Sequence, residues 1–210
     1  MQSSKTKQIY LAVIAILGWL ALALQFYLII QNRVVSIPET IIRYFSYFTL
    51  LTNILVALYC THVVLTPDSR LGKYFSRSGV VTAITVYITV VGVVYNIILR
   101  YLWNPKGLEM IVDELLHLVI PILFLLYWLL FTVKGKLKWN IFSWLIYPLA
   151  YFIWILIFGA LTAFYPYPFI NVTELGYNKV ILHSCVLTAG FLLLSLLFVA
   201  IDKLMKSRTI

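Results

Sequence analysis

The chain has 210 residues, of which 63% are hydrophobic and only 11% are charged, and its mean hydropathy is +0.99. A soluble globular domain carries roughly a quarter charged residues, so this composition excludes an ordinary soluble domain and indicates an integral membrane protein. The formal net charge of +9 does not indicate a nucleic-acid partner, because that interpretation would require bases clustered on one soluble surface.

Six stretches of the chain contain no Asp, Glu, Lys or Arg, and they span residues 8–32, 44–67, 78–99, 115–133, 139–173 and 180–201. A helix needs roughly 20 apolar residues to cross a bilayer core, so each stretch has room for one crossing. Backbone groups cannot stay unpaired in lipid, so helices are the expected form. The sequence predicts an all-α, single integral membrane domain over residues 1–210, with transmembrane helices at roughly 8–31, 41–65, 79–103, 109–133, 139–164 and 177–203.

The charges between these helices divide unequally between the two ends of the predicted bundle. The end with both termini has eleven bases and two acids, which gives +9 (11 − 2). The opposite end has five bases and five acids, which gives zero (5 − 5). The positive-inside rule therefore predicts that both termini lie in the cytoplasm.

Polar residues inside a membrane helix are costly, so their positions suggest where function lies. On the second predicted helix, Thr49, Thr52 and Asn53 are spaced i, i+3 and i+4 and share one face. At about 1.5 Å per residue they lie roughly 12–18 Å below the outer surface. Asn96 on the third helix lies about 10 Å below it, and so does His183 on the sixth.

The fourth predicted helix contains the most suggestive group of polar residues. His117 lies one turn below Asp113 and Glu114, roughly 12 Å from the outer surface. Pro121 has no amide hydrogen for the carbonyl of His117, its i−4 partner, so the helix should kink or loosen at the histidine. An ordinary proline kink, which membrane helices tolerate, is the simpler interpretation.

The similar depth of these side chains predicts a polar cavity open toward the outer leaflet, and hydrogen bonds between packed helices are the alternative. Such a cavity is compatible with three functions. The first is an intramembrane hydrolase without a cofactor, in which a histidine takes the proton of a hydroxyl nucleophile. The second is a metal site built from Asp113, Glu114, His117 and His183. The third is non-catalytic binding or transport of a lipid or small molecule.

Three parts of the chain together resemble a known family. They are Arg43–Asn53, His117–Pro121, and the aromatic segments with proline at Trp139–Pro148 and Tyr165–Phe169. Their order and spacing are similar to the androgen-induced protein family of multi-pass membrane proteins, most closely to its bacterial six-helix branch. The resemblance spans nearly the whole chain and implies a bacterial cell membrane, with membrane lipid as the partner.

Animal members of that family are described as threonine hydrolases, which cleave fatty acid esters of hydroxy fatty acids with one intramembrane Thr and one His. The resemblance implies that Thr49 is the nucleophile, with Thr52 as a competing register, and that His117 is the base. We expect Asn53 or Asn96 to donate a hydrogen bond to the oxyanion. Asp113 and His183 are assigned to substrate contacts. The acids beside His117 depart from the animal members, so the metal alternative stays open.

Overall fold

The chain is 81% helical, and residues 5–206, which the computed structural model describes, contain no strand. Six helical stretches in this range are long and apolar enough to cross a membrane: Lys5–Gln31, Phe48–Leu65, Ser78–Leu99, Leu108–Phe131, Phe142–Thr162 and Val172–Lys206. The predicted all-α fold of six membrane helices is confirmed.

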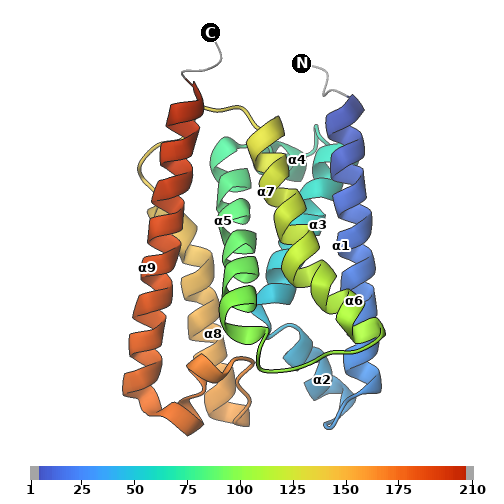
Figure 1. Cartoon of the computed structure of the whole chain (residues 1–210), viewed down its shortest axis with the longest axis vertical. Coiled ribbons are helices and arrows are strands. Elements are labelled where there is room, and N and C mark those ends of the chain that lie inside the picture. The colour runs from blue at the N-terminus through green and yellow to red at the C-terminus, as the bar shows by residue number, and fades with distance from the viewer. Residues whose placement is uncertain (1–4, 207–210) are drawn as a thin grey trace.

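Four helices pack against one another as one group, with α1 at its edge (Figure 1). They are α1 (Lys5–Gln31), α3 (Phe48–Leu65), α5 (Ser78–Val94) and α7 (Ile120–Phe131), and each packs against two of the others. The last two long helices, α8 (Ile146–Thr162) and α9 (Val172–Lys206), lie on the far side of α5, and α9 packs on α5. The start of α1 and the end of α9 lie at the same end of the bundle, as an even number of crossings requires.

The close approach of α1 and α3 depends on small side chains. A Cβ added at Gly18 would lie 3.3 Å from Cβ of Ala57, which is fully buried. Small residues at helix interfaces are typical of membrane proteins, because close backbone approach increases van der Waals contact where lipid provides no hydrophobic driving force.

The second predicted helix, 41–65, is interrupted. A separate helix, α2 (Ile37–Tyr44), ends before α3 begins at Phe48, and no Pro or Gly marks the break. Tertiary contacts hold the break instead, since Tyr151 donates a hydrogen bond to the Ser46 carbonyl over 2.8 Å. As a result Thr49 lies in the first turn of α3 rather than in the middle of a long helix.

The other boundaries differ by a few residues. The third helix ends at Leu99, the fourth spans Leu108–Phe131 and the fifth ends at Thr162. α9 begins at Val172 but includes a non-helical Gly176 with φ of 73°, so its regular part begins where predicted. A short helix, α4 (Arg70–Phe75), lies between α3 and α5.

Large apolar side chains cover much of the outside of the helices. Leu130, Leu161 and Leu193 are 69%, 80% and 68% exposed. A monomeric soluble protein rarely exposes such a surface, whereas a bilayer covers it. The chain therefore has the architecture of an integral, multi-pass membrane protein.

Candidate functional site

Two π-helical segments mark the part of the bundle where α5 meets the fourth crossing. They are η1 (Tyr95–Leu99), which continues α5, and η2 (Leu115–Val119), which joins α6 (Leu108–Glu114) to α7. The amide of Ile120 donates to the carbonyl of Leu115, five residues back, and Pro121 has no amide hydrogen. The predicted loosening at the histidine is confirmed, and it deprives the carbonyls of Leu116 and His117 of their usual helical donors.

Two asparagines supply the missing hydrogen bonds. Asn53 Nδ2 donates to the Leu116 carbonyl over 3.2 Å and to the Thr49 carbonyl over 2.9 Å. Asn96 Nδ2 donates to the His117 carbonyl over 3.1 Å and to the Gly92 carbonyl over 2.8 Å. An amide NH₂ group has two hydrogens, so each asparagine donates both of them to backbone carbonyls. The expected role of Asn53 or Asn96 as oxyanion donor would require breaking one of these bonds.

Gly92 explains how α5 comes so close to the kink. A Cβ at this position would lie 3.2 Å from Pro121 Cβ and 3.5 Å from the His117 carbonyl oxygen. A larger residue would push the two helices apart and separate Asn96 from that carbonyl.

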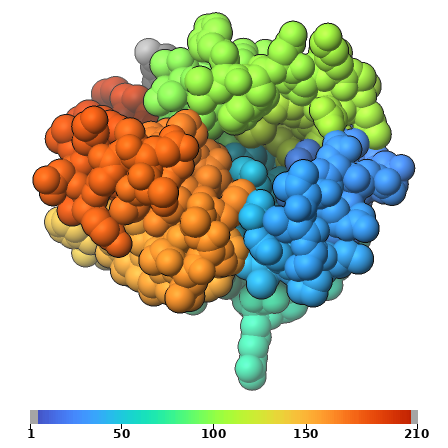
Figure 2. Space-filling model, turned by 90° about the horizontal axis from the view of Figure 1, so that it is seen from below, coloured from blue at the N-terminus to red at the C-terminus, as the bar shows by residue number. Residues whose placement is uncertain are grey.

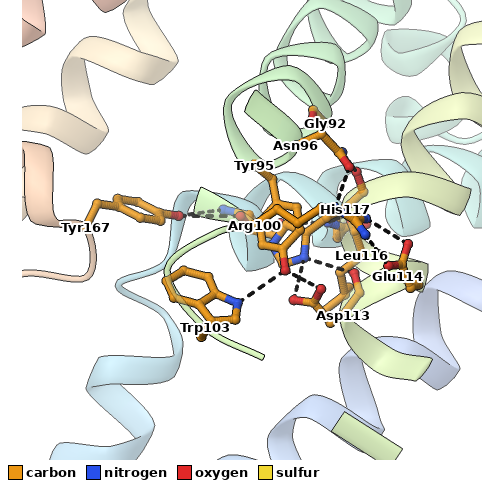
Figure 3. A network of polar contacts seen from close by, with 12 residues as sticks. Gly92, Tyr95, Asn96, Arg100, Trp103, Asp113, Glu114, Leu116, His117 and Tyr167 are labelled. Carbon is orange, nitrogen blue, oxygen red and sulfur yellow. Dashed lines mark hydrogen bonds and ion pairs between the residues drawn. The ribbon is translucent and has the colours of Figure 1, made fainter. Parts of the chain in front are cut away.

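The imidazole of His117 is held in one orientation (Figure 3). Its Nδ1 lies 2.9 Å from the Asp113 carbonyl oxygen and 3.1 Å from Asp113 Oδ1. A carbonyl oxygen only accepts, so Nδ1 has the hydrogen and, in the neutral ring, Nε2 has the lone pair. The opposite tautomer would place two lone pairs face to face. His117 is thus prepared to accept a proton at Nε2.

Tyr95 covers one face of that imidazole. The two rings stack with centroids 3.7 Å apart and an interplanar angle of 13°. The Tyr95 hydroxyl donates to Asp113 Oδ2 and accepts from Trp103 Nε1 over 3.2 Å. Tyr95 therefore ties the histidine and its carboxylate to η1.

An ion pair between Arg100 and Glu114 lies beside these residues. Arg100 donates through both terminal nitrogens to Glu114, over 2.6 and 2.9 Å. Its Nε donates to Asn96 Oδ1 over 2.8 Å, which orients the asparagine amide toward the kink. A bidentate pair of this kind fixes geometry as well as charge.

An apolar cavity of about 210 Å³ lies between α3, α5 and η1 on one side and the α8–α9 pair on the other. It is lined mainly by aliphatic and aromatic side chains from α3, α5, η1, α8, α9 and the connection around η4 (Pro168–Ile170). Six of the lining residues have a hydroxyl group: Thr49, Tyr95, Tyr151, Tyr167, Ser184 and Thr188. The outer surface of this end is hollowed between α2, the connection after η1 and the connection from α8 to α9 (Figure 2).

The predicted site residues divide into three groups around this cavity. Thr49 lies on the cavity wall, 7% exposed. Asn96, Asp113 and His117 form the polar cluster, on the other side of Tyr95. Thr52, Asn53 and His183 form other hydrogen bonds inside the protein. The cavity is therefore mostly apolar, and most of the polar side chains join helices, as the alternative interpretation expected.

Thr52 Oγ1 lies 3.1 Å from Tyr147 Oη, one turn away from Thr49. His183 Nδ1 lies 3.0 Å from the Phe169 carbonyl and fastens α9 to η4. Within residues 5–206, no hydrogen bond joins the side chains of Thr49 and His117.

Of the four residues of the metal alternative, Asp113 and His117 lie in contact, with Asp113 Oδ1 3.1 Å from His117 Nδ1, while Glu114 and His183 have other partners. Glu114 pairs with Arg100, and His183 bonds to the Phe169 carbonyl. Among the described residues, no group of three or more His, Cys, Asp and Glu side chains has an arrangement that could hold a metal ion.

Sequence reasoning missed two tyrosines at the site. Tyr95 precedes Asn96 on η1, and Tyr167 lies between two prolines in the connection from α8 to α9. Tyr167 Oη accepts from the Thr49 amide over 3.3 Å and lies 3.5 Å from Thr49 Oγ1. Tyrosines are common at membrane interfaces, so their number alone gave no signal.

Comparisons of the chain with protein-family models, with curated proteins and with solved structures found no match. The fold and the site define a class, a six-helix membrane protein with an apolar cavity beside a kinked, histidine-containing helix.

Proposed function

We propose that this protein is an intramembrane lipid-ester hydrolase, in which Thr49 Oγ1 is the nucleophile and His117 is the general base. One observation carries the proposal: Asn53 Nδ2 bonds to the carbonyls of both Thr49 and Leu116. This single amide holds the first turn of α3 against the turn that contains His117, at the edge of an apolar cavity.

The cavity suits the acyl part of a membrane lipid. Its wall is largely aliphatic and aromatic, and large apolar side chains are exposed on the outside of the helices, where lipid would contact them. An acyl chain lying along α5, α8 and α9 would place its ester carbonyl at the few hydroxyls of the wall, of which Thr49 is one.

The chemistry follows the usual acyl-transfer scheme. Thr49 Oγ1 attacks the ester carbonyl carbon, the carbonyl π electrons move to its oxygen, and the threonine proton passes to His117 Nε2. The bond to the alcohol then breaks, and the alcohol leaves with that proton. Water hydrolyses the acyl-threonine in a second, equivalent step. Because Tyr95 covers His117, the proton must cross a bridging water or follow a rotation of the Tyr95 or Thr49 side chain.

The second candidate is a protein that binds or transports an acyl chain without chemistry. The stacking of Tyr95 on His117 favours this candidate, because it separates the base from the cavity in the arrangement described here. The two candidate functions differ in the role of Thr49, which is the nucleophile in the hydrolase and only a wall residue in the binding protein.

The membrane setting belongs to the same proposal. The bundle end where α1 begins and α9 ends carries the excess of bases, so the positive-inside rule favours a cytoplasmic position for it. The cavity then lies toward the outer leaflet. The resemblance noted above suggests a bacterial cell membrane.

The test is hydrolysis of para-nitrophenyl octanoate by the purified full chain in lipid nanodiscs. Thr49→Ala removes a hydroxyl and a methyl group, and with them the long contact of Oγ1 to Tyr167 Oη at 3.5 Å. The hydrogen bonds that its backbone makes to Asn53 and Tyr167 remain. We expect its rate to fall to the uncatalysed background. Thr85→Ala is the matched control, because Thr85 is equally buried but its hydroxyl donates to the Val81 carbonyl.

Thr52→Ala tests the competing register. Loss of activity in Thr52→Ala with full activity in Thr49→Ala would transfer the nucleophile to Thr52. Full activity in both variants, or no hydrolysis by the unmodified chain, would contradict the hydrolase proposal. Stabilisation of the unmodified chain by octanoate without hydrolysis would then favour the binding protein.

A further inference from the structure

Tyr167 is fixed beside the proposed nucleophile by packing. It lies in the connection between α8 and α9 and is 8% exposed. Its ring stacks on Phe169 at 5.3 Å with an interplanar angle of 4°, and it meets the edge of Tyr47 at 6.0 Å. Two flanking prolines, Pro166 and Pro168, restrict the backbone on either side. The ring therefore has little freedom to turn away from the cavity that it lines.

The hydroxyl of Tyr167 points toward the first turn of α3 (Figure 3). Its oxygen accepts from the Thr49 amide over 3.3 Å, so its own hydrogen is directed elsewhere. The nearby acceptor is Thr49 Oγ1, at 3.5 Å. This distance is long for an O–H···O hydrogen bond, whose usual range ends near about 3.0 Å. The hydrogen is thus weakly engaged and available to a stronger acceptor beside Thr49.

An ester hydrolase needs such a donor. The tetrahedral intermediate places negative charge on the former carbonyl oxygen, and preorganised donors aimed at that oxygen are a large part of catalysis. The amide hydrogens of Asn53 and Asn96 are already given to backbone carbonyls. Since the oxyanion is bonded to the same carbon as Thr49 Oγ1, a donor close to Oγ1 is within reach of it.

We propose that the Tyr167 hydroxyl is the oxyanion donor of this site. The inference rests on the proposed hydrolase function and adds a catalytic residue to it. When Thr49 Oγ1 bonds to the carbonyl carbon and the π electron pair moves to oxygen, Tyr167 donates a hydrogen bond to that oxygen and keeps its proton. The bond weakens again when the alcohol leaves and the carbonyl re-forms.

Two features of the surroundings agree with this role. Burial raises the pKa of Tyr167 to about 12, so the group stays protonated and able to donate at neutral pH. Thr49 lies in the first turn of α3, where the partial positive charge of the helix N-terminus also favours a developing anion. The break between α2 and α3 creates this N-terminus at the cavity wall.

The test is Tyr167→Phe in the full chain, assayed with para-nitrophenyl octanoate in nanodiscs. The variant keeps the stacked ring and loses only the hydroxyl. We expect kcat to fall by about a hundredfold or more, as for loss of one oxyanion donor elsewhere, with KM changed by less than about threefold. Tyr44→Phe is the matched control, because Tyr44 is also buried but its hydroxyl donates to the Leu22 carbonyl.

Two inhibitors separate this role from a purely structural one. Octyl trifluoromethyl ketone forms a tetrahedral adduct with an oxyanion, whereas octyl methyl ether has no carbonyl. Tyr167→Phe should weaken the ketone by about the same factor as kcat and leave the ether unchanged. Parallel weakening of both inhibitors would overturn the inference and assign Tyr167 to packing.

The outcomes also distinguish the inference from the function on which it rests. Unchanged kcat in Tyr167→Phe, with activity abolished in Thr49→Ala, would overturn the oxyanion role and leave the hydrolase standing. Full activity in Thr49→Ala would overturn the oxyanion role of Tyr167, and full activity in Thr52→Ala as well would overturn the hydrolase function.

Discussion

The two ends of this bundle both hold charged groups in hydrogen bonds or ion pairs within the protein, but they use them differently. At the end where α1 begins and α9 ends, a set of contacts that we call the α9 latch joins the end of α9 to the loop after α7. The latch consists of Lys134, Gly135, Leu137, Asp202 and Lys203. Asp202, 1% exposed, accepts from the Leu137 amide over 3.0 Å, and Lys203 donates to the Leu137 carbonyl over 2.9 Å. Lys134 donates to the Trp128 carbonyl and lies 3.9 Å from the centre of the Trp128 ring.

The opposite end holds the His117 cluster, made of Tyr95, Arg100, Asp113, Glu114 and His117. Most of its polar atoms are paired with one another or with backbone. The exception is the imidazole, for which, among the described residues, only Nδ1 has a hydrogen-bond partner. Ionisable residues in a membrane protein suggest function by default. The comparison refines that rule. Charged groups whose hydrogen bonds are all made within the protein indicate a structural role, whereas a ring nitrogen without a hydrogen-bond partner indicates where chemistry can occur.

The sharpest way to break this comparison is His117→Gln. Glutamine keeps a polar side chain of similar reach but cannot accept the threonine proton at neutral pH. We expect kcat for para-nitrophenyl octanoate to fall by about 10²- to 10⁴-fold, the usual contribution of a general base. His62→Gln is the control, since His62 lies near the other end of α3 and bonds to Thr66. Equal activity in both variants would show that the unused ring nitrogen has no catalytic role.

A second prediction concerns the kink itself. Pro121→Ala restores an amide that can donate to the His117 carbonyl, in competition with Asn96. The helix should become more regular at η2 and shift the imidazole, and misplacement by about 1 Å can cost up to about 10²-fold in rate. Thermal unfolding should not occur at a lower temperature, because a backbone hydrogen bond is gained. A variant with normal kcat would mean that the π-helical segment serves only packing.

The sequence predicted the backbone correctly where composition or a single proline determines it. Long uncharged stretches gave six crossings, and Pro121 gave the loosened turn at His117. It failed at the break between α2 and α3, because no Pro or Gly marks it. Hydrogen bonds from distant residues, such as that of Tyr151 to Ser46, hold the chain there. Periodicity along one helix contains no information about such contacts.

The site was predicted in part for the same reason. Depth along each helix placed Thr49, Asn53 and His117 at a similar level, and Asn53 does join their two turns. Depth does not say which way a side chain points around the helix axis. In the structure, most of the predicted polar side chains bond to backbone carbonyls, and mainly apolar residues line the cavity. Tyr167 was missed because its loop folds back on α3 only in three dimensions.

The smallest expected effect on activity comes from the α9 latch. Asp202→Ala leaves the buried Leu137 amide without its acceptor, which costs about 1–3 kcal/mol of unfolding free energy. We expect earlier thermal unfolding but a kcat within about twofold of the unmodified chain, since the latch lies at the opposite end from Thr49. Asp68→Ala, at an exposed turn, should change neither quantity. A large loss of kcat in folded Asp202→Ala protein would contradict the division between a structural end and a chemical end, because it would show that the two ends are energetically coupled through α9.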